Sequence, residues 1–291
     1  MNFLPHPLRA LLELLRLRPV TLEVISGKGD WGVRYRADER PRFCIVLAGQ
    51  SWIEIRDGLP QLLYQGDVLL FNRPQLLALG GRTTDFEMLG GILDVQQANA
   101  GLLMNLLPPV MHWCEADVGD TRLARMMNVI AHECSREGAL RQARLARLVQ
   151  LLLLEALRAG YGKHVASAGM LAGLRDPKVS KALQLMHSDV GRDWLLEDLG
   201  AMADLRRAGF ARRFLRVVGI TPMEYLARWR MSIAVDSLLN CDFSLDSIAS
   251  KAGFGSARAF SNAFHARMGC GPMTFARGKH DRRRKARPRR H

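Results

Sequence analysis

The sequence predicts an α+β protein in which a β-barrel, followed by helices, precedes an all-α domain with an internal repeat. Three observations lead to this prediction. Residues 20–95 contain short β-rich segments separated by Gly, Pro or Asp. Residues 121–160 carry apolar side chains at helical spacing. A set of four anchors recurs fifty residues later in the same order: Phe210, Phe214, Gly219 and Pro222 return as Phe260, Phe264, Gly269 and Pro272.

Seven segments of the first half have the composition of strands: EVIS, WGVRY, FCIVLAG, SWIEI, LLYQG, DVLLF and LLALGG. Short strands with regular turns predict a closed or double-sheet architecture. The run RFCIVLAGQSWIEI, followed by QGDVLLFNRP, resembles the small cupin barrel that fronts many AraC-type regulators. That resemblance implies a barrel over residues 1–110 with a sensory or purely structural role, and composition does not separate the two.

A cupin enzyme would need a metal held by His and carboxylate ligands. No histidine stands between His6 and His112, and the position where a cupin often carries His reads Arg73-Pro74-Gln75. We therefore expect no metal, no cofactor and no enzymatic activity. A cupin-type enzyme with an appended nucleic-acid-binding domain is the alternative.

The segment 111–165 is predicted to be helical. The prolines at 108 and 109 mark a boundary before it, and Gly138 separates two helices. The second helix carries a wide apolar stripe formed by Leu145, Leu148, Val149, Leu152 and Leu153. Packing on the barrel and a homodimer interface both fit this stripe. The Gly- and Ala-rich residues 166–175 predict a linker.

The cysteines and the apolar runs limit the class of protein. The five cysteines are scattered and form no CxxC motif or Cys/His cluster, so the sequence indicates neither a zinc site nor a disulfide framework. Charged residues interrupt the leucine-rich N-terminus, which predicts an amphipathic surface helix before Pro19 rather than a signal peptide. The leucine run 148–157 is too short to span a bilayer. We expect a cytoplasmic protein with no membrane contact.

Positive charge is concentrated in the second half. The chain has a formal net charge of +14, and residues 176–291 hold 22 Lys and Arg against 11 Asp and Glu. Nucleic acid is the natural partner of such a segment, because each neutralised phosphate releases counterions. Charge alone does not exclude the alternative that this is a basic surface that is merely well solvated.

The repeat predicts two helix-turn-helix units joined by a long helix. Asp176 is placed to cap a first helix with Pro177 at its first position. Leu199 and Ala203 match Ile248 and Ala252 at an offset of 49, whereas the Phe residues match at 50, so the extra residue falls in the turn. The long connecting helix starts with Thr221 as cap and Pro222 at its first position.

These motifs in combination resemble the tandem helix-turn-helix DNA-binding domain of the AraC/XylS transcription regulators. The residues that carry the resemblance are FARRF…GxxPMEYLARWRM and SIASKAGFGSARAFSNAF…GxxP, within residues 176–280. The resemblance implies a sequence-specific regulator that places two recognition helices about 34 Å apart on double-stranded promoter or operator DNA. It further implies a homodimer, a small-molecule effector in the barrel, and RNA polymerase as partner if the protein is an activator.

The predicted DNA-binding residues come from both recognition helices. In the second unit Ser256 caps the helix, and its outer face carries Arg258, Ser261, Asn262 and His265. Arg pairs bidentately with guanine and Asn with adenine. In the first unit Arg212 takes the base-reading position, and Arg206 and Arg207 reach phosphates at the helix entry.

The first unit departs from the family pattern, and the tail has a composition of its own. Asp204 and Arg206 stand where a turn Gly and a Ser cap are usual, and Asp tolerates the left-handed conformation better than most residues. The tail 281–291 has seven basic residues and is predicted to lack regular structure. Attraction to phosphates and a purely solubilising role both fit this tail.

Overall fold

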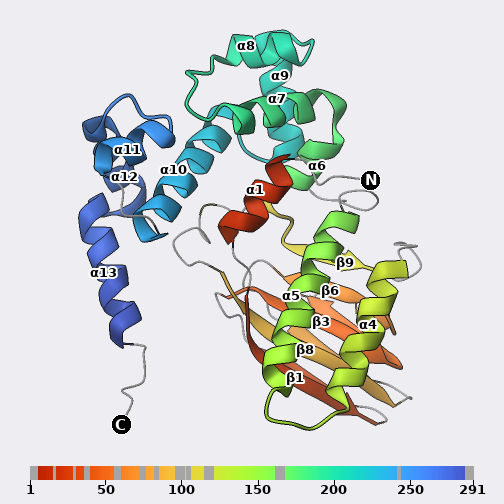
Figure 1. Ribbon diagram of the computed structural model, residues 1–291. Helices are drawn as coiled ribbons and strands as arrows, with labels where there is room; N and C mark the ends of the chain where they lie inside the picture. Colours follow the sequence, from red (N-terminus) through yellow and green to blue (C-terminus); the bar gives the residue numbers. More distant parts are fainter. Residues whose placement is uncertain are drawn as a thin grey trace.

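The β-rich half forms two facing antiparallel sheets in the computed structural model. The model describes residues 6–15, 18–28, 31–35, 40–55, 60–71, 77–81, 85–95, 102, 106–114, 121–160, 168–240 and 244–285 (Figure 1). The five-stranded sheet has the order β1 (Arg18–Gly27), β8 (Phe86–Asp94), β3 (Arg42–Ala48), β6 (Val68–Phe71) and β9 (Val110–Trp113). The four-stranded sheet has the order β2 (Trp31–Tyr35), β7 (Leu77–Gly81), β4 (Gln50–Ile55) and β5 (Gln61–Tyr64).

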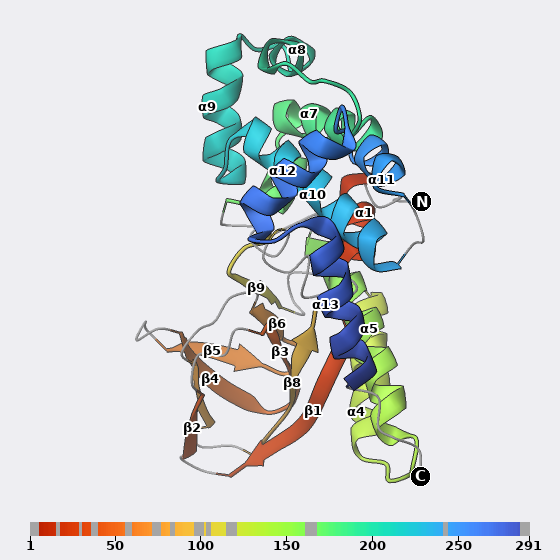
Figure 2. The same ribbon diagram turned by 90° about the vertical axis from the view of Figure 1, so that its left-hand side faces the viewer.

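The two sheets face each other (Figure 2), and strand alternation turns every second side chain into the space between them. Side chains that point inward from both sheets form one apolar cluster of Cys44, Val46, Ile53, Leu63, Leu69, Phe71, Phe86 and Met88. The predicted double-sheet architecture is therefore confirmed. Strand β9 pairs with β6 and carries the sheet to Trp113, past the boundary predicted at residue 110. The segment Arg73-Pro74-Gln75 lies outside the described residues.

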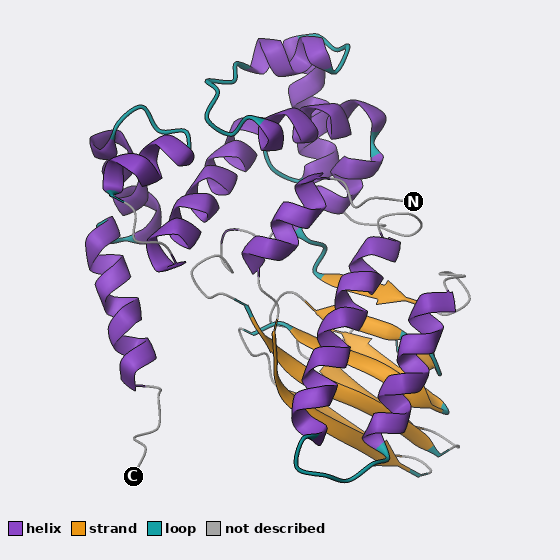
Figure 3. Cartoon of the chain, in the orientation of Figure 1, coloured by secondary structure: helices purple, strands orange, loops and turns teal. Residues whose placement is uncertain are grey.

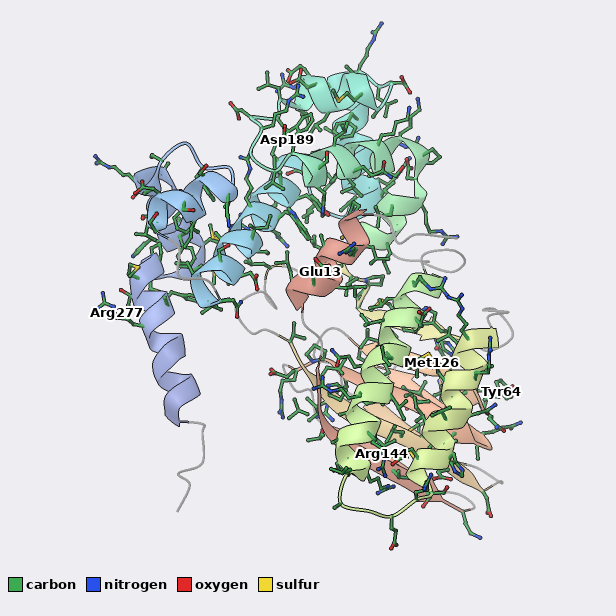
Figure 4. The ribbon with its side chains drawn as sticks, in the orientation of Figure 1. Glu13, Tyr64, Met126, Arg144, Asp189 and Arg277 are labelled. Atoms are coloured by element: carbon green, nitrogen blue, oxygen red, sulfur yellow. The ribbon has the colours of Figure 1, made fainter. Side chains whose placement is uncertain are left out.

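Two helices cover the outer face of the five-stranded sheet (Figure 3). They are α4 (Thr121–Cys134) and α5 (Arg141–Gly160). Arg144, labelled in Figure 4, donates from Nε to Oε1 of Glu133 at 2.7 Å and ties the two helices together. Most of the predicted apolar stripe is buried in this layer, with Leu145 1% exposed and Val149, Leu152 and Leu153 fully covered. The stripe thus packs within the chain.

The described part of the predicted linker 166–175 contains a buried helix. Residues 170–175 form helix α6 (Met170–Arg175), whose Met170, Leu171 and Leu174 are buried. Gly and Ala indicate flexibility in isolation, but here the small side chains allow close packing. A Cβ on Gly173 would lie 2.9 Å from Cδ1 of Leu183. Residues 161–167 lie outside the described part of the chain.

The second half contains the two predicted helix-turn-helix units. Helix α7 (Pro177–Ser188) precedes the first unit, formed by α8 (Leu196–Met202) and α9 (Arg207–Val218). Helix α10 (Pro222–Asn240) connects it to the second unit, formed by α11 (Leu245–Lys251) and α12 (Ala257–Met268), and α13 (Pro272–Lys285) follows. Asp176 caps α7 by accepting from the amides of Lys178 and Val179, as the sequence predicts.

Helix α13 continues through Lys285, five residues into the tail that the sequence predicts to lack regular structure. Arg and Lys are good helix formers, and Pro272 at the first position starts the helix, so propagation into the basic segment costs little. Residues 286–291 lie outside the described part of the chain.

The N-terminal helix α1 (His6–Leu15) lies between the two halves of the molecule (Figure 1). The predicted surface helix is amphipathic, but its apolar side is covered: Leu8 and Leu11 are fully buried, and α1 contacts α7 and α10. Within the described residues, we find no helix that combines the length and apolar character needed to cross a bilayer.

The turn of each helix-turn-helix unit depends on one residue in the left-handed conformation. Gly253 has φ 75° and Asp204 has φ 53°, so the turn with Asp survives as predicted. A Cβ on Gly253 would lie 2.5 Å from the carbonyl oxygen of Val190 and 2.9 Å from Nε of Arg230. The same Nε donates to Val190 O at 2.9 Å, and Nη2 donates to Arg192 O. The second turn is thus packed against the loop before α8.

We expect Gly253→Ala to lower the free energy of unfolding by about 2–4 kcal/mol, because it combines left-handed strain with the overlap at Val190. Gly255 is the matched control, since it lies two residues away and a Cβ there meets nothing within 4 Å. Gly255→Ala should change stability by less than about 0.5 kcal/mol. Urea unfolding of the three proteins checks this, and equal loss in both variants would contradict the role of the Val190 contact.

Candidate DNA-binding surface

One face of each predicted recognition helix is fixed by buried aromatic rings. Phe210 and Phe214 of α9 are fully buried, and Phe214 packs edge-on against Tyr225 at 5.8 Å between ring centroids. The second unit repeats this arrangement on α12. Phe264 packs edge-on against Phe275 at 5.3 Å. Because these rings are locked, the opposite faces of α9 and α12 are held toward solvent.

The exposed face of α12 carries most of the predicted base-reading residues. Arg258, Asn262 and His265 are exposed and follow one another at spacings of four and three residues, so they share a face. Ser261 is only half-exposed. Ser256 is engaged as the helix cap, because its Oγ accepts from the amide of Ala259 at 3.1 Å. The geometry therefore brings three of the five residues together.

The exposed face of α9 carries Arg212 together with Arg216, one turn further on. Sequence reasoning missed Arg216, although the four-residue spacing from Arg212 was a usable signal. Arg206 precedes the helix and makes no side-chain cap. Arg207 donates to Oε1 of Glu197 at 2.9 Å in an exposed ion pair, so part of its charge is compensated.

The turn before α9 is supported by two lysines. Nζ of Lys178 and Nζ of Lys181 each donate to Oδ2 of Asp204 at 3.1 Å. Hydrogen bonds from Lys178 and Lys181, of which the first has the larger effect, hold the pKa of Asp204 below its ordinary value. This carboxylate therefore links the turn of the first unit to α7.

Two ion pairs position the recognition helices on their neighbours. Nε of Arg213 on α9 donates to both carboxylate oxygens of Asp176, at 3.0 and 2.9 Å. Burial raises the pKa of Asp176, but the hydrogen bonds from Arg213 and from two backbone amides outweigh it, and the net shift is downward.

In the second unit Arg267 of α12 donates to both oxygens of Glu224 on α10, at 3.1 and 2.9 Å. The hydrogen bond from Arg267 is the main reason that the pKa of Glu224 is lowered.

The barrel contains a cavity of about 230 Å³ that opens beside β1 and β8. Apolar side chains line most of it, including Phe43, Phe71 and Met88, while Glu23 and Arg42 add charge. Burial and the nearby carboxylate of Asp67 raise the pKa of Cys44, which also lines the cavity, to about 12. Cys44 is therefore a neutral thiol at physiological pH.

A β-barrel followed by two helix-turn-helix units on a connecting helix is the architecture of a DNA-binding transcription regulator. Comparison with known proteins agrees with the geometry. Residues 6–161 match the Cupin family, and residues 199–278 match a helix-turn-helix domain family. The chain belongs to the AraC-like transcription regulators.

Two relatives and one solved structure illustrate the match. An AraC-like transcription regulator from Streptomyces lividans is 30% identical over 298 residues, covering 92% of this chain and 97% of the relative. The RCS-specific HTH-type transcriptional activator RclR of Escherichia coli is 32% identical over 106 residues, covering 36% of this chain and 37% of the relative. The DNA-binding domain of AdpA, solved in complex with a target DNA, aligns with 38% of this chain and 99% of its own at 27% identity and a TM-score of 0.36.

Asp176 combines a helix cap with an ion pair, and two substitutions separate these roles. Asp176→Asn keeps the cap acceptor and should cost about 0.5–1 kcal/mol at pH 7, whereas Asp176→Ala should cost about 1–2 kcal/mol. The folded-state pKa lies below the ordinary value of 3.8, so the ion-pair stabilisation is complete above that pH and is lost as pH falls through the folded pKa. Urea unfolding at pH 7 and pH 3 measures both effects. A stability gap between wild type and Asp176→Asn that stays constant toward acid would contradict this assignment.

Proposed function

We propose that the chain reads DNA bases with the exposed faces of α9 and α12, and that residues 176–280 act as the DNA-binding domain. The observation that carries the proposal is the fixed orientation of Arg258 and Asn262, opposite the buried Phe260 and Phe264. Arg258 and Asn262 have the donor geometry for guanine and adenine edges in a major groove. Arg212 serves the same purpose in the first unit, while Arg206 and Arg207 contact phosphates. Ser256 caps the N-terminus of α12, and Ser261 and His265 flank Arg258 and Asn262.

The high positive charge of this half supports the proposal on electrostatic grounds. Each phosphate contact made by Lys or Arg contributes about −0.9 to the slope of log K against log salt. Residues that read bases and residues that bind phosphates therefore affect different properties of DNA binding. Loss of a base reader alters the preferred sequence, and loss of a phosphate contact weakens binding to all sequences.

Arg258→Ala is expected to weaken binding to the preferred site by about 1–3 kcal/mol and to relax the preference at one base position. A randomised-site selection on the full chain measures the preference at every position. Arg136, an exposed residue of the loop that joins α4 to α5, is the matched control, and Arg136→Ala should leave both affinity and preference unchanged. If Arg258→Ala keeps the wild-type preference at all positions, the proposed orientation of α12 is wrong.

We further propose that the barrel, over residues 1–110, binds a small-molecule effector in the cavity beside β1 and β8. The cavity is mostly apolar with a few charged groups, which suits a small amphipathic ligand. Gly90 forms part of its wall, and a Cβ there would lie 3.6 Å from Cδ1 of Ile25, an ordinary contact. A Cβ at Gly90 therefore has room, since the nearest backbone atom, Phe43 O, would be 3.9 Å from it.

Gly90→Val is expected to abolish the stabilisation that a bound effector gives the wild type, while the variant stays folded. A thermal-shift screen of small metabolites on the wild type identifies ligands, and the variant is tested with each of them. Gly91 provides the contrast, because a Cβ there would lie 2.2 Å from Thr21 O, so Gly91→Ala should unfold more easily without any ligand. A ligand that stabilises Gly90→Val as much as the wild type would exclude this cavity as its site.

The remaining proposals concern assembly and cellular role. We propose that the protein acts in the cytoplasm as a homodimer through α4 and α5, where Val129 and Leu151 remain exposed at 51% and 53%, and light scattering of the purified chain tests this assembly. We propose that it activates transcription through RNA polymerase, as the name of the Escherichia coli relative states activation for that protein. Transcription in vitro from a bound promoter tests the sign of regulation. We propose no enzymatic role.

A further inference from the structure

Three potential metal ligands meet at one end of the five-stranded sheet, and one of them, Asp67, is remote in sequence from the other two. Strands β6 and β9 pair so that Leu69 lies opposite His112, and Asp67 and Cys114 are the next residues beyond this ladder. Nε2 of His112 lies 3.1 Å from Oδ2 of Asp67 and 3.4 Å from Sγ of Cys114. All three donor atoms lie within 4.8 Å of one another.

These separations suit a tetrahedral metal ion. Bond lengths of about 2.0–2.1 Å to nitrogen and oxygen and about 2.3 Å to sulfur place neighbouring ligands of a tetrahedral zinc ion about 3.3–3.6 Å apart. The separations from His112 to Asp67 and to Cys114, 3.1 and 3.4 Å, are close to these values. An ion could therefore enter with small shifts of the side chains.

The carboxylate of Asp67 is held in place by the turn that precedes β6. Asp67 is 3% exposed, and the amide of Tyr64 donates to its Oδ2 at 3.0 Å. The backbone of the turn bonds to β3 at Val46 on both sides, with Gly66 in the left-handed conformation. A buried carboxylate favours a cation close to it.

We propose that Asp67, His112 and Cys114 form a three-ligand binding site for Zn²⁺ or a similar borderline divalent cation. An imidazole and a thiolate favour such ions over Mg²⁺ and Ca²⁺, which prefer oxygen ligands alone. The site concerns the barrel alone, so it stands or fails independently of the proposed DNA contacts.

The test uses the full chain, freed of metal with a chelator and kept reduced. Titration with Zn²⁺ in a calorimeter should show one saturable site and a higher Tm at saturation. Titration with Co²⁺ should give a near-ultraviolet thiolate-to-metal absorption band, which reports sulfur coordination directly. Cys114→Ser should remove that band and weaken Zn²⁺ binding at least about 10-fold, and His112→Ala should weaken it similarly.

Cys270→Ser is the matched control, because Cys270 is a half-exposed thiol in the helical half of the chain. It should keep both the band and the affinity. If His112→Ala fails to fold without metal, Cys114→Ser still decides the question, since Ser is nearly isosteric with Cys. Absence of saturable Zn²⁺ binding, or binding that Cys114→Ser leaves unchanged, would overturn the proposal and leave the approach of His112 to Asp67 as a structural contact.

Discussion

The orientation of both recognition helices depends on two buried phenylalanines per unit, packed against an aromatic ring of the following helix. Phe214 meets Tyr225 and Phe264 meets Phe275, each pair edge-on at a similar distance. Such ring pairs add about 0.5–1.5 kcal/mol beyond the area that they bury, and they fix the rotation of a helix about its own axis. The solvent-facing side chains of α9 and α12 follow from that rotation.

The two units are built alike but are anchored differently. In the first unit, hydrogen bonds from Lys178 and Lys181 to Asp204 hold the turn. In the second unit, close packing of Gly253 against Val190 and Arg230 holds the turn. Burial lowers the pKa of Arg230, and its hydrogen bonds to two backbone carbonyls compensate for that burial. Arg230 therefore joins the loop of the first unit to the turn of the second.

Local patterns predicted the helical half well, because capping and repeat spacing act over few residues. Asp176, Thr221 and Ser256 each accept the amide hydrogen bonds expected of a cap. The repeat also reaches further than predicted, because Tyr225 and Phe275 are again fifty residues apart. Long-range features were missed. Strand β8 lies inside the five-stranded sheet, yet Gly90 and Gly91 break its β-rich texture. Asp67 meets His112 only through strand pairing that no local pattern specifies.

The position of α1 gives the barrel a physical connection to the helical half. The chain runs from α1 directly into β1, an edge strand of the five-stranded sheet beside the proposed effector cavity. On its other side α1 contacts α7 and α10, with Leu8 and Leu11 buried between the two halves. Helix α7 is in turn tied to α9 by the Asp176–Arg213 ion pair. The contacts of α1 therefore connect β1 with the first recognition helix through α7, and with the second unit through α10 and through the packing of Gly253 against Val190.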